Sequence, residues 1–132
     1  MYTMKEVCTQ VGMSYETLKF YCNEGLIPNI QRDKNNYRIF DERNINWIKS
    51  LQCLRKTGMS IKTMKEYLSY CLEGSSSILQ RKAMLDIQKK ILLKQLEEIN
   101  ESIEFIDKKQ QYFDDILDGK IEYTSNLIDI KH

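Results

Sequence analysis

The cysteines carry most of the reactive chemistry in this sequence, and they are scattered along it. Cys8, Cys22, Cys53 and Cys71 form no C-x-x-C pair, so neither a zinc ribbon nor a disulfide-dense secreted scaffold is indicated. The single histidine is His132, the last residue, which leaves little material for histidine catalysis or a mixed Cys/His metal cage. The sequence therefore predicts free thiols, no metal, no cofactor and no enzymatic activity.

Composition and charge indicate a small soluble protein with a basic first part. Apolar residues make up 42% of the 132 and charged residues 30%, and no apolar run is long enough to enter a membrane, so we expect a cytoplasmic protein. Residues 1–74 hold eleven Lys/Arg against eight Asp/Glu, and residues 75–132 hold nine against eleven. This asymmetry has the sign expected if the first part contacts phosphate groups.

Two short helices separated by a tight turn are predicted near the N-terminus. Thr3 and Glu6 have the spacing of a capping box, so a helix should begin near Met4. It should stop at Gly12, and Ser14 can cap a second helix that ends near residues 24–25. This spacing is typical of a helix-turn-helix.

A hairpin and two further helices follow. Residues 30–40 read as two extended stretches around a turn at 33–36. Asp41 can cap a third helix that ends at Gly58, and Ser60 can cap a fourth. The polar segment 74–77 is the one linker-like break in the sequence.

One long helix is predicted from about residue 78 to residue 117, because this range contains no Gly or Pro. Its apolar residues follow alternating four- and three-residue steps, which is the pattern of a coiled-coil seam. At 1.5 Å per residue the helix would be roughly 60 Å long, so its seam needs a partner, and a second copy of the chain is the simplest one. We predict a homodimer held by Leu92, Leu96, Ile99, Ile103, Ile106 and Phe113.

Three sequence strings are more specific than these patterns. The first is Gly12-Met-Ser-Tyr-Glu-Thr-Leu-Lys-Phe-Tyr21, the second Glu24-Gly-Leu-Ile-Pro28 and the third Asn36-Tyr-Arg-Ile-Phe40. Together they resemble the recognition helix, turn and wing of the mercury-resistance-regulator (MerR) family, with Asn36 in place of the usual wing glycine. Asn tolerates the left-handed conformation, so a wing is still expected.

The resemblance implies a mainly α fold: a winged helix-turn-helix domain with a two-stranded wing over 1–74, an antiparallel coiled-coil dimerisation helix over 78–118, and a tail over 119–132. It also implies a dimer that binds a pseudo-palindrome in double-stranded promoter DNA. Such a dimer would activate transcription by distorting the promoter spacer, and so act on RNA polymerase indirectly. The DNA-contacting residues would be Ser14, Tyr15, Thr17, Lys19, Tyr21, Arg32, Tyr37 and Arg38.

Cys53 is the candidate sensor of a signal. It precedes Leu54-Arg-Lys-Thr-Gly-Met59, and in this respect the chain resembles the short aldehyde- and electrophile-responsive branch of the family. Lys49 and Lys56 lie at i−4 and i+3 of this cysteine on a helix, where their charges could favour the thiolate. The alternative is that Cys53 is a small residue without a role.

Three other functions fit parts of the sequence. The chain could be a DNA-binding repressor that responds to no effector, in which case no thiol would change its activity. It could be a coiled-coil adaptor that binds protein, with no salt-dependent affinity for duplex DNA. A thiol enzyme is the weakest alternative, because the sequence offers no Cys-His pairing.

Overall fold

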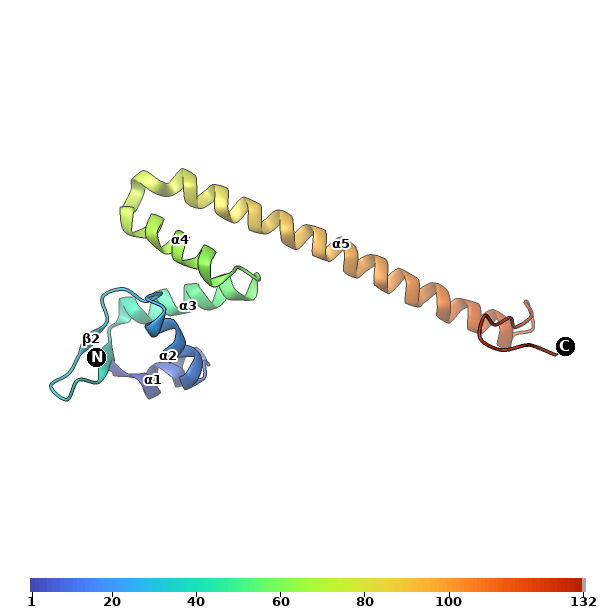
Figure 1. Ribbon diagram of the computed structural model, residues 1–132, viewed down its shortest axis with the longest axis horizontal. Helices are drawn as coiled ribbons and strands as arrows, with labels where there is room; N and C mark the ends of the chain where they lie inside the picture. The colour runs from blue at the N-terminus through green and yellow to red at the C-terminus, as the bar shows by residue number, and fades with distance from the viewer. Residues whose placement is uncertain (132) are drawn as a thin grey trace. The chain divides into compact units, whose positions relative to one another are not determined.

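The computed structural model describes residues 1–131, and the lone histidine, His132, lies outside the described residues. The chain divides into two compact units, one covering Met1–Lys89 and the other beginning at Lys90. The fold is mainly helical, with a small antiparallel sheet and a long C-terminal helix (Figure 1). This confirms the predicted fold class.

Local capping defines helix α1, Met4–Val11. The Thr3 hydroxyl oxygen accepts a hydrogen bond from the Glu6 backbone N–H at 3.1 Å, and the Glu6 carboxylate accepts one from the Thr3 N–H at 3.2 Å. Gly12 ends the helix at φ 68°, a left-handed conformation that glycine adopts without steric cost. The capping box and the stop are both where the sequence predicts them.

Helix α2, Tyr15–Asn23, is the second helix of the helix-turn-helix. Ser14 caps it, with the hydroxyl oxygen accepting from the Thr17 N–H at 3.2 Å. Leu18 is fully buried on its inner face. The cap and the buried face together fix which residues of α2 face the solvent.

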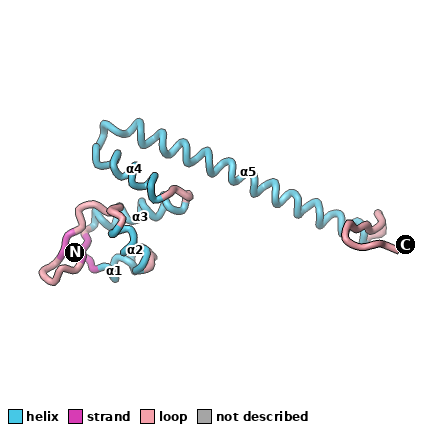
Figure 2. The backbone as a smooth tube through the Cα atoms, viewed as in Figure 1, coloured by secondary structure: helices cyan, strands magenta, loops and turns pink. Residues whose placement is uncertain are grey.

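The wing is a three-stranded antiparallel sheet with the strand order β1-β3-β2, coloured magenta in Figure 2. Strands β2, Gln31–Arg32, and β3, Arg38–Phe40, form the predicted hairpin. The additional strand β1, Tyr2–Thr3, pairs with the other edge of β3, with Tyr2 opposite Phe40. Two residues are too short for a periodic pattern, so the sequence predicts two strands and the tertiary structure supplies the third.

Helices α3, Glu42–Lys56, and α4, Ile61–Glu73, complete the packing of the first unit. Asp41 caps α3 through a reciprocal pair of hydrogen bonds with Asn44, at 2.8 and 2.9 Å. Ser60 caps α4. The core lies among the four helices and the sheet, and its largest fully buried side chains are Tyr21, Phe40, Leu18, Leu26, Ile45, Ile48, Leu51 and Met64.

The polar break expected at 74–77 is a 3-10 turn, Gly74–Ser77, that joins α4 to the next helix. Ser77 is fully buried, and its hydroxyl lies within hydrogen-bond distance of the carbonyl oxygens of Tyr70 and Gly74. The Arg81 guanidinium donates to the Gly74 carbonyl at 2.7 Å. This joint is held by the Ser77 side chain of the turn and the Arg81 side chain of the next helix, both bonded to backbone carbonyls.

Helix α5 runs from Ile78 to Leu117, the range that the sequence predicts. Gly119, two residues after the end of the helix, has a left-handed φ of 75°. The predicted seam residues are 38–56% exposed in the single chain, so the described residues leave the apolar seam of α5 open. No helix among residues 1–131 combines the length and apolar character needed to cross a membrane.

Candidate nucleic-acid interface

The first turns of α2 present polar side chains to solvent. Ser14 and Lys19 are exposed, Tyr15 is 53% exposed, and Thr17 is half-buried. The Ser14 hydroxyl donates to Thr17 Oγ1 at 2.8 Å in addition to capping the helix. In a helix-turn-helix, the N-terminal residues of the second helix are those that reach base edges in the major groove.

Two cations that the sequence reasoning missed lie beside this helix start. Arg55 and Lys56, both exposed, line a shallow hollow of about 250 Å³ together with Ser14 and Thr17. They come from the last turn of α3, far from α2 in the sequence. The basic pair in the last turn before Gly58 is the signal that could have pointed to them.

The wing tip is built around one carboxylate. Asp33 Oδ1 accepts hydrogen bonds from the backbone N–H groups of Asn35 and Tyr37, at 2.9 and 3.0 Å. Asn36 has φ 66°, so it takes the left-handed conformation expected of a residue in place of glycine. The Arg32 guanidinium donates to the Asn36 carbonyl at 2.9 Å, and the Tyr37 side chain is 70% exposed.

Arg38 connects the wing to the recognition helix. It lies on β3, is half-buried, and donates from Nη2 to Asn23 Oδ1 on the last turn of α2 at 2.8 Å. One hydrogen bond occupies only a part of the guanidinium, which has five N–H donors. The hydrogen bond to Asn23 thus fixes the orientation of the Arg38 side chain.

Tyr21 is the most buried of the predicted DNA-contacting residues. Its side chain is 1% exposed and is among the largest fully buried residues of the core. It falls three residues after the buried Leu18, on the same inner face of α2. The burial of Tyr21 positions α2, but the side chain also lines the hollow shared by Ser14 and Arg55, so its phosphate contact stays a prediction.

Cys53 differs from the other three cysteines because it is exposed. It lies at a hollow of about 390 Å³ lined by side chains from three helices, among them Trp47, Tyr67 and Leu85.

Burial raises the pKa of the Cys22 thiol, an effect that the nearby Arg38 and Arg32 oppose. Within residues 1–131, no three His, Cys, Asp or Glu side chains are grouped as a metal site would require.

Together, the capped helix pair, the exposed start of α2 and the braced wing define a winged helix-turn-helix, a class of DNA-binding module. The profile of the MerR helix-turn-helix regulatory protein family matches residues 2–71. The chain belongs to this family, and it is a DNA-binding transcriptional regulator.

Relatives span most of the chain. An uncharacterised helix-turn-helix transcriptional regulator of Haemophilus influenzae is 32% identical over 85% of this chain and 83% of its own. The transcriptional regulator AdhR of Bacillus subtilis is 34% identical over 67% of this chain and 63% of its own.

A solved structure is similar over most of the chain. The crystal structure of HiNmlR, a MerR family regulator lacking the sensor domain and bound to promoter DNA, has a TM-score of 0.72 and 31% identity, covering 87% of this chain and 91% of that one. These proteins are transcriptional regulators, which supports the prediction that the chain is not an enzyme.

Proposed function

We propose that the chain is a homodimeric regulator that binds a pseudo-palindrome in a promoter spacer and activates transcription by distorting the DNA. The observation that carries this proposal is the exposed N-terminal turn of α2, with a wing tied to the same helix through Arg38 and Asn23. The similarity to a regulator crystallised on promoter DNA supports it. RNA polymerase would respond to the changed DNA geometry, so specificity would depend partly on the energy of deforming the spacer.

The proposed DNA contacts are of two kinds, those with base edges and those with the sugar-phosphate backbone. Ser14, Tyr15 and Thr17 would read base edges, because they occupy the exposed start of α2. The cationic and wing residues would contact the sugar-phosphate backbone and position the protein without reading sequence. These backbone contacts are assigned to Lys19, Arg32, Tyr37 and Arg38, with Arg55 and Lys56 added from the hollow beside α2.

Two copies would associate through α5. In the single chain, Ile99, Ile103 and Ile106 are each more than half exposed, and burying such side chains against one another favours association. We assign residues 1–74 to DNA binding and residues 78–118 to an antiparallel coiled coil. A dimer of this kind would place two recognition helices on the two halves of the pseudo-palindrome.

The signal in this proposal is an aldehyde or another small electrophile that reacts with Cys53. The Cys53 thiolate would add to the carbonyl carbon, forming an S–C bond, while the C=O π electrons move to oxygen, which takes a proton from water. The adduct would occupy the hollow lined by Trp47 on α3, Tyr67 on α4 and Leu85 on α5. Added volume there would change how the three helices pack.

One observation favours a second function, repression without an effector. HiNmlR is described as lacking the sensor domain, and its chain is covered almost completely by this one. By this similarity, DNA binding alone could regulate transcription, with no dependence on any thiol. The two functions differ in whether an electrophile changes the complex with DNA.

Footprinting and in vitro transcription on the promoter region nearest to the protein's own gene test the proposal, with and without formaldehyde. We expect a symmetric footprint within the spacer, hypersensitivity at its centre, and more transcript after formaldehyde. A footprint with unchanged or lower transcript under both conditions would favour the repressor. The absence of salt-dependent binding to any duplex would contradict the assignment of the DNA contacts.

A further inference from the structure

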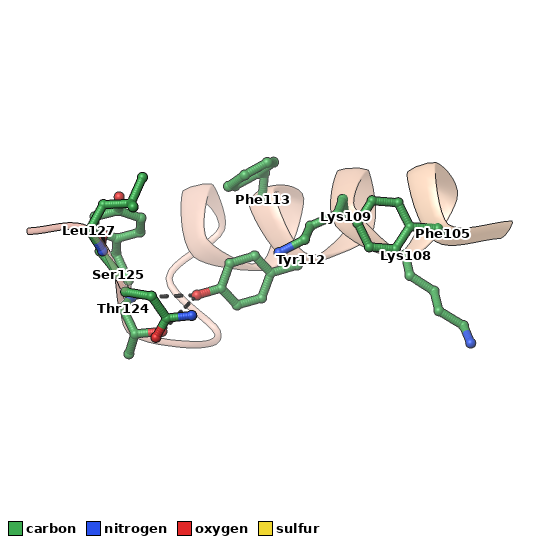
Figure 3. A pocket seen from close by; sticks show the side chains of 10 residues that line it. Phe105, Lys108, Lys109, Tyr112, Phe113, Thr124, Ser125 and Leu127 are labelled. Atoms are coloured by element: carbon green, nitrogen blue, oxygen red, sulfur yellow. Dashed lines mark hydrogen bonds between the residues drawn. The ribbon is translucent and has the colours of Figure 1, made fainter. Parts of the chain in front are cut away.

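The C-terminal tail and the end of α5 line an open pocket that contains none of the proposed DNA-contacting residues. The pocket has a volume of about 740 Å³, within the range typical of small-molecule sites. Figure 3 shows side chains of the helix, including Tyr112 and Phe113, facing side chains of the tail, including Thr124 and Leu127. The tail is therefore packed against α5 at this point.

Tyr112 holds the tail in place. Its phenol oxygen lies 3.1 Å from Thr124 Oγ1, and the Thr124 backbone N–H donates to the same oxygen at 3.4 Å (Figure 3). The Lys109 ammonium lies 5.7 Å from the centre of the Tyr112 ring, within the distance of a cation–π contact. The hydrogen bonds from Thr124, with a smaller contribution from Lys109, lower the pKa of Tyr112.

The walls of the pocket combine aromatic rings with positive charge. Phe105, Phe113 and Tyr123 line it and are 62%, 50% and 41% exposed, so their faces are open to an occupant. Lys108 and Lys109 also line the pocket, with the Lys109 ammonium beside Tyr112 and the Lys108 side chain extending away from that ring (Figure 3). Lys108 is paired with Glu104 at 3.3 Å, but both side chains are exposed, and an exposed pair of this kind is weak enough for an anion to compete.

We propose that this pocket binds a small aromatic anion, such as an aryl carboxylate, whose ring packs against Phe105 and Tyr123 and whose carboxylate faces Lys109 and Lys108. The ring supplies apolar area for the exposed aromatic faces, and the carboxylate supplies the complementary charge. The hydroxyl and amide groups of the tail offer further donors. This site is independent of Cys53 and requires no covalent step.

Helical geometry favours a small ligand over a second copy of the chain. Residues 105, 108, 109 and 112 repeat at helical spacing and share one face of α5. At 100° per residue, the centre of this face is roughly 120° from the centre of the seam formed by residues 99, 103, 106 and 113. Dimerisation through the seam therefore leaves most of the pocket face accessible, with Phe113 at the border.

Isothermal titration calorimetry of the full chain with 1-naphthoate tests the proposal. We expect saturable binding of one naphthoate per chain, at least about tenfold weaker binding of the neutral 1-naphthamide, and no binding of 1-naphthylmethylammonium. Amide NMR signals of Thr124 and Asn126 in the tail should shift on addition of naphthoate. Equal affinity for naphthoate and the amide, or the absence of saturable binding, would overturn the proposal.

Variants locate the site. The double variant Lys108→Gln/Lys109→Gln and the single variant Phe105→Ala should each weaken naphthoate binding about tenfold or more, while Lys94→Gln, which removes an exposed charge elsewhere on α5, should not. These side chains are on the surface, and circular dichroism checks that the helix content is unchanged. Unchanged affinity in the first two variants would refute the site. A change of sedimentation coefficient in Phe105→Ala without naphthoate binding would instead identify a protein interface.

Discussion

The Arg38 guanidinium on strand β3 donates a 2.8 Å hydrogen bond to the Asn23 side chain on the last turn of α2. This contact joins the wing to the recognition helix across fifteen residues of sequence. Arg38 carries the positive charge, and Asn23 orients the side chain that carries it. The pair therefore allows the two contributions to DNA binding to be measured independently.

We predict that Arg38→Ala weakens binding to all duplexes and lowers the slope of log K against log salt by about 1, because a phosphate contact is lost. Asn23→Ala should weaken binding less and leave the slope unchanged, because the charge remains. Fluorescence anisotropy over a series of salt concentrations measures both. A loss confined to one base sequence, with the slope unchanged in Arg38→Ala, would contradict the phosphate assignment.

Tyr15 is expected to contribute to sequence preference, because it is exposed at the start of α2. In a selection from randomised duplexes, Tyr15→Ala should change the preferred base at one position per half-site, by about 1–3 kcal/mol of discrimination. Lys19→Gln is the matched control from the same helix, and it should weaken binding to all sequences uniformly. An unaltered base preference in Tyr15→Ala would remove this residue from the reading surface.

The double variant Ile99→Asp/Ile106→Asp should be monomeric, because a dimer would have to bury unpaired carboxylates in its apolar seam. Asn100→Asp adds one negative charge at an exposed position off the seam and should remain dimeric. Sedimentation velocity at micromolar concentration separates the two results. A dimer that persists in the double variant would show that the seam is wrongly assigned.

Cys53→Ser should bind the promoter normally and lose activation by formaldehyde, since the hydroxyl is a much weaker nucleophile than a thiolate. A coupling of about 1–3 kcal/mol between adduct and active conformation is sufficient, because it corresponds to a roughly 5- to 150-fold change in population. Cys8→Ser, Cys22→Ser and Cys71→Ala serve as matched controls and should respond normally when folded. Full induction of Cys53→Ser in a transcription assay would exclude this cysteine as the switch.

The rate of alkylation of the Cys22 thiol should rise at a higher pH in the folded protein than in an unfolded peptide. Burial raises the pKa of Cys22, so at a given pH less of it is thiolate, and its reaction rate should rise only at higher pH. Arg38→Ala removes one of the charges that oppose this rise, and should move the rate profile further toward high pH. Mass spectrometry after timed iodoacetamide treatment between pH 7 and 10 measures the profile for each peptide. A profile at lower pH than that of the unfolded peptide would contradict the effect of burial.

The sequence alone determined the order and ends of the helices, because those depend on residues a few positions apart. The capping box of Thr3 and Glu6, the cap at Ser14 and the stop at Gly12 each act through neighbouring backbone groups. For the same reason, the turn at Asn36 could be predicted from one residue type. The family resemblance then placed these elements in a DNA-binding module.

The tertiary structure decided which side chains are available for function. Tyr21 falls within the motif of the recognition helix, yet the packing of α2 buries it. The contact between Arg38 and Asn23, the hollow beside Arg55 and the pocket closed by Tyr112 and Thr124 all join residues distant in sequence. Helical and strand periodicity describes which face a residue occupies, but it carries no information about what that face meets across the fold.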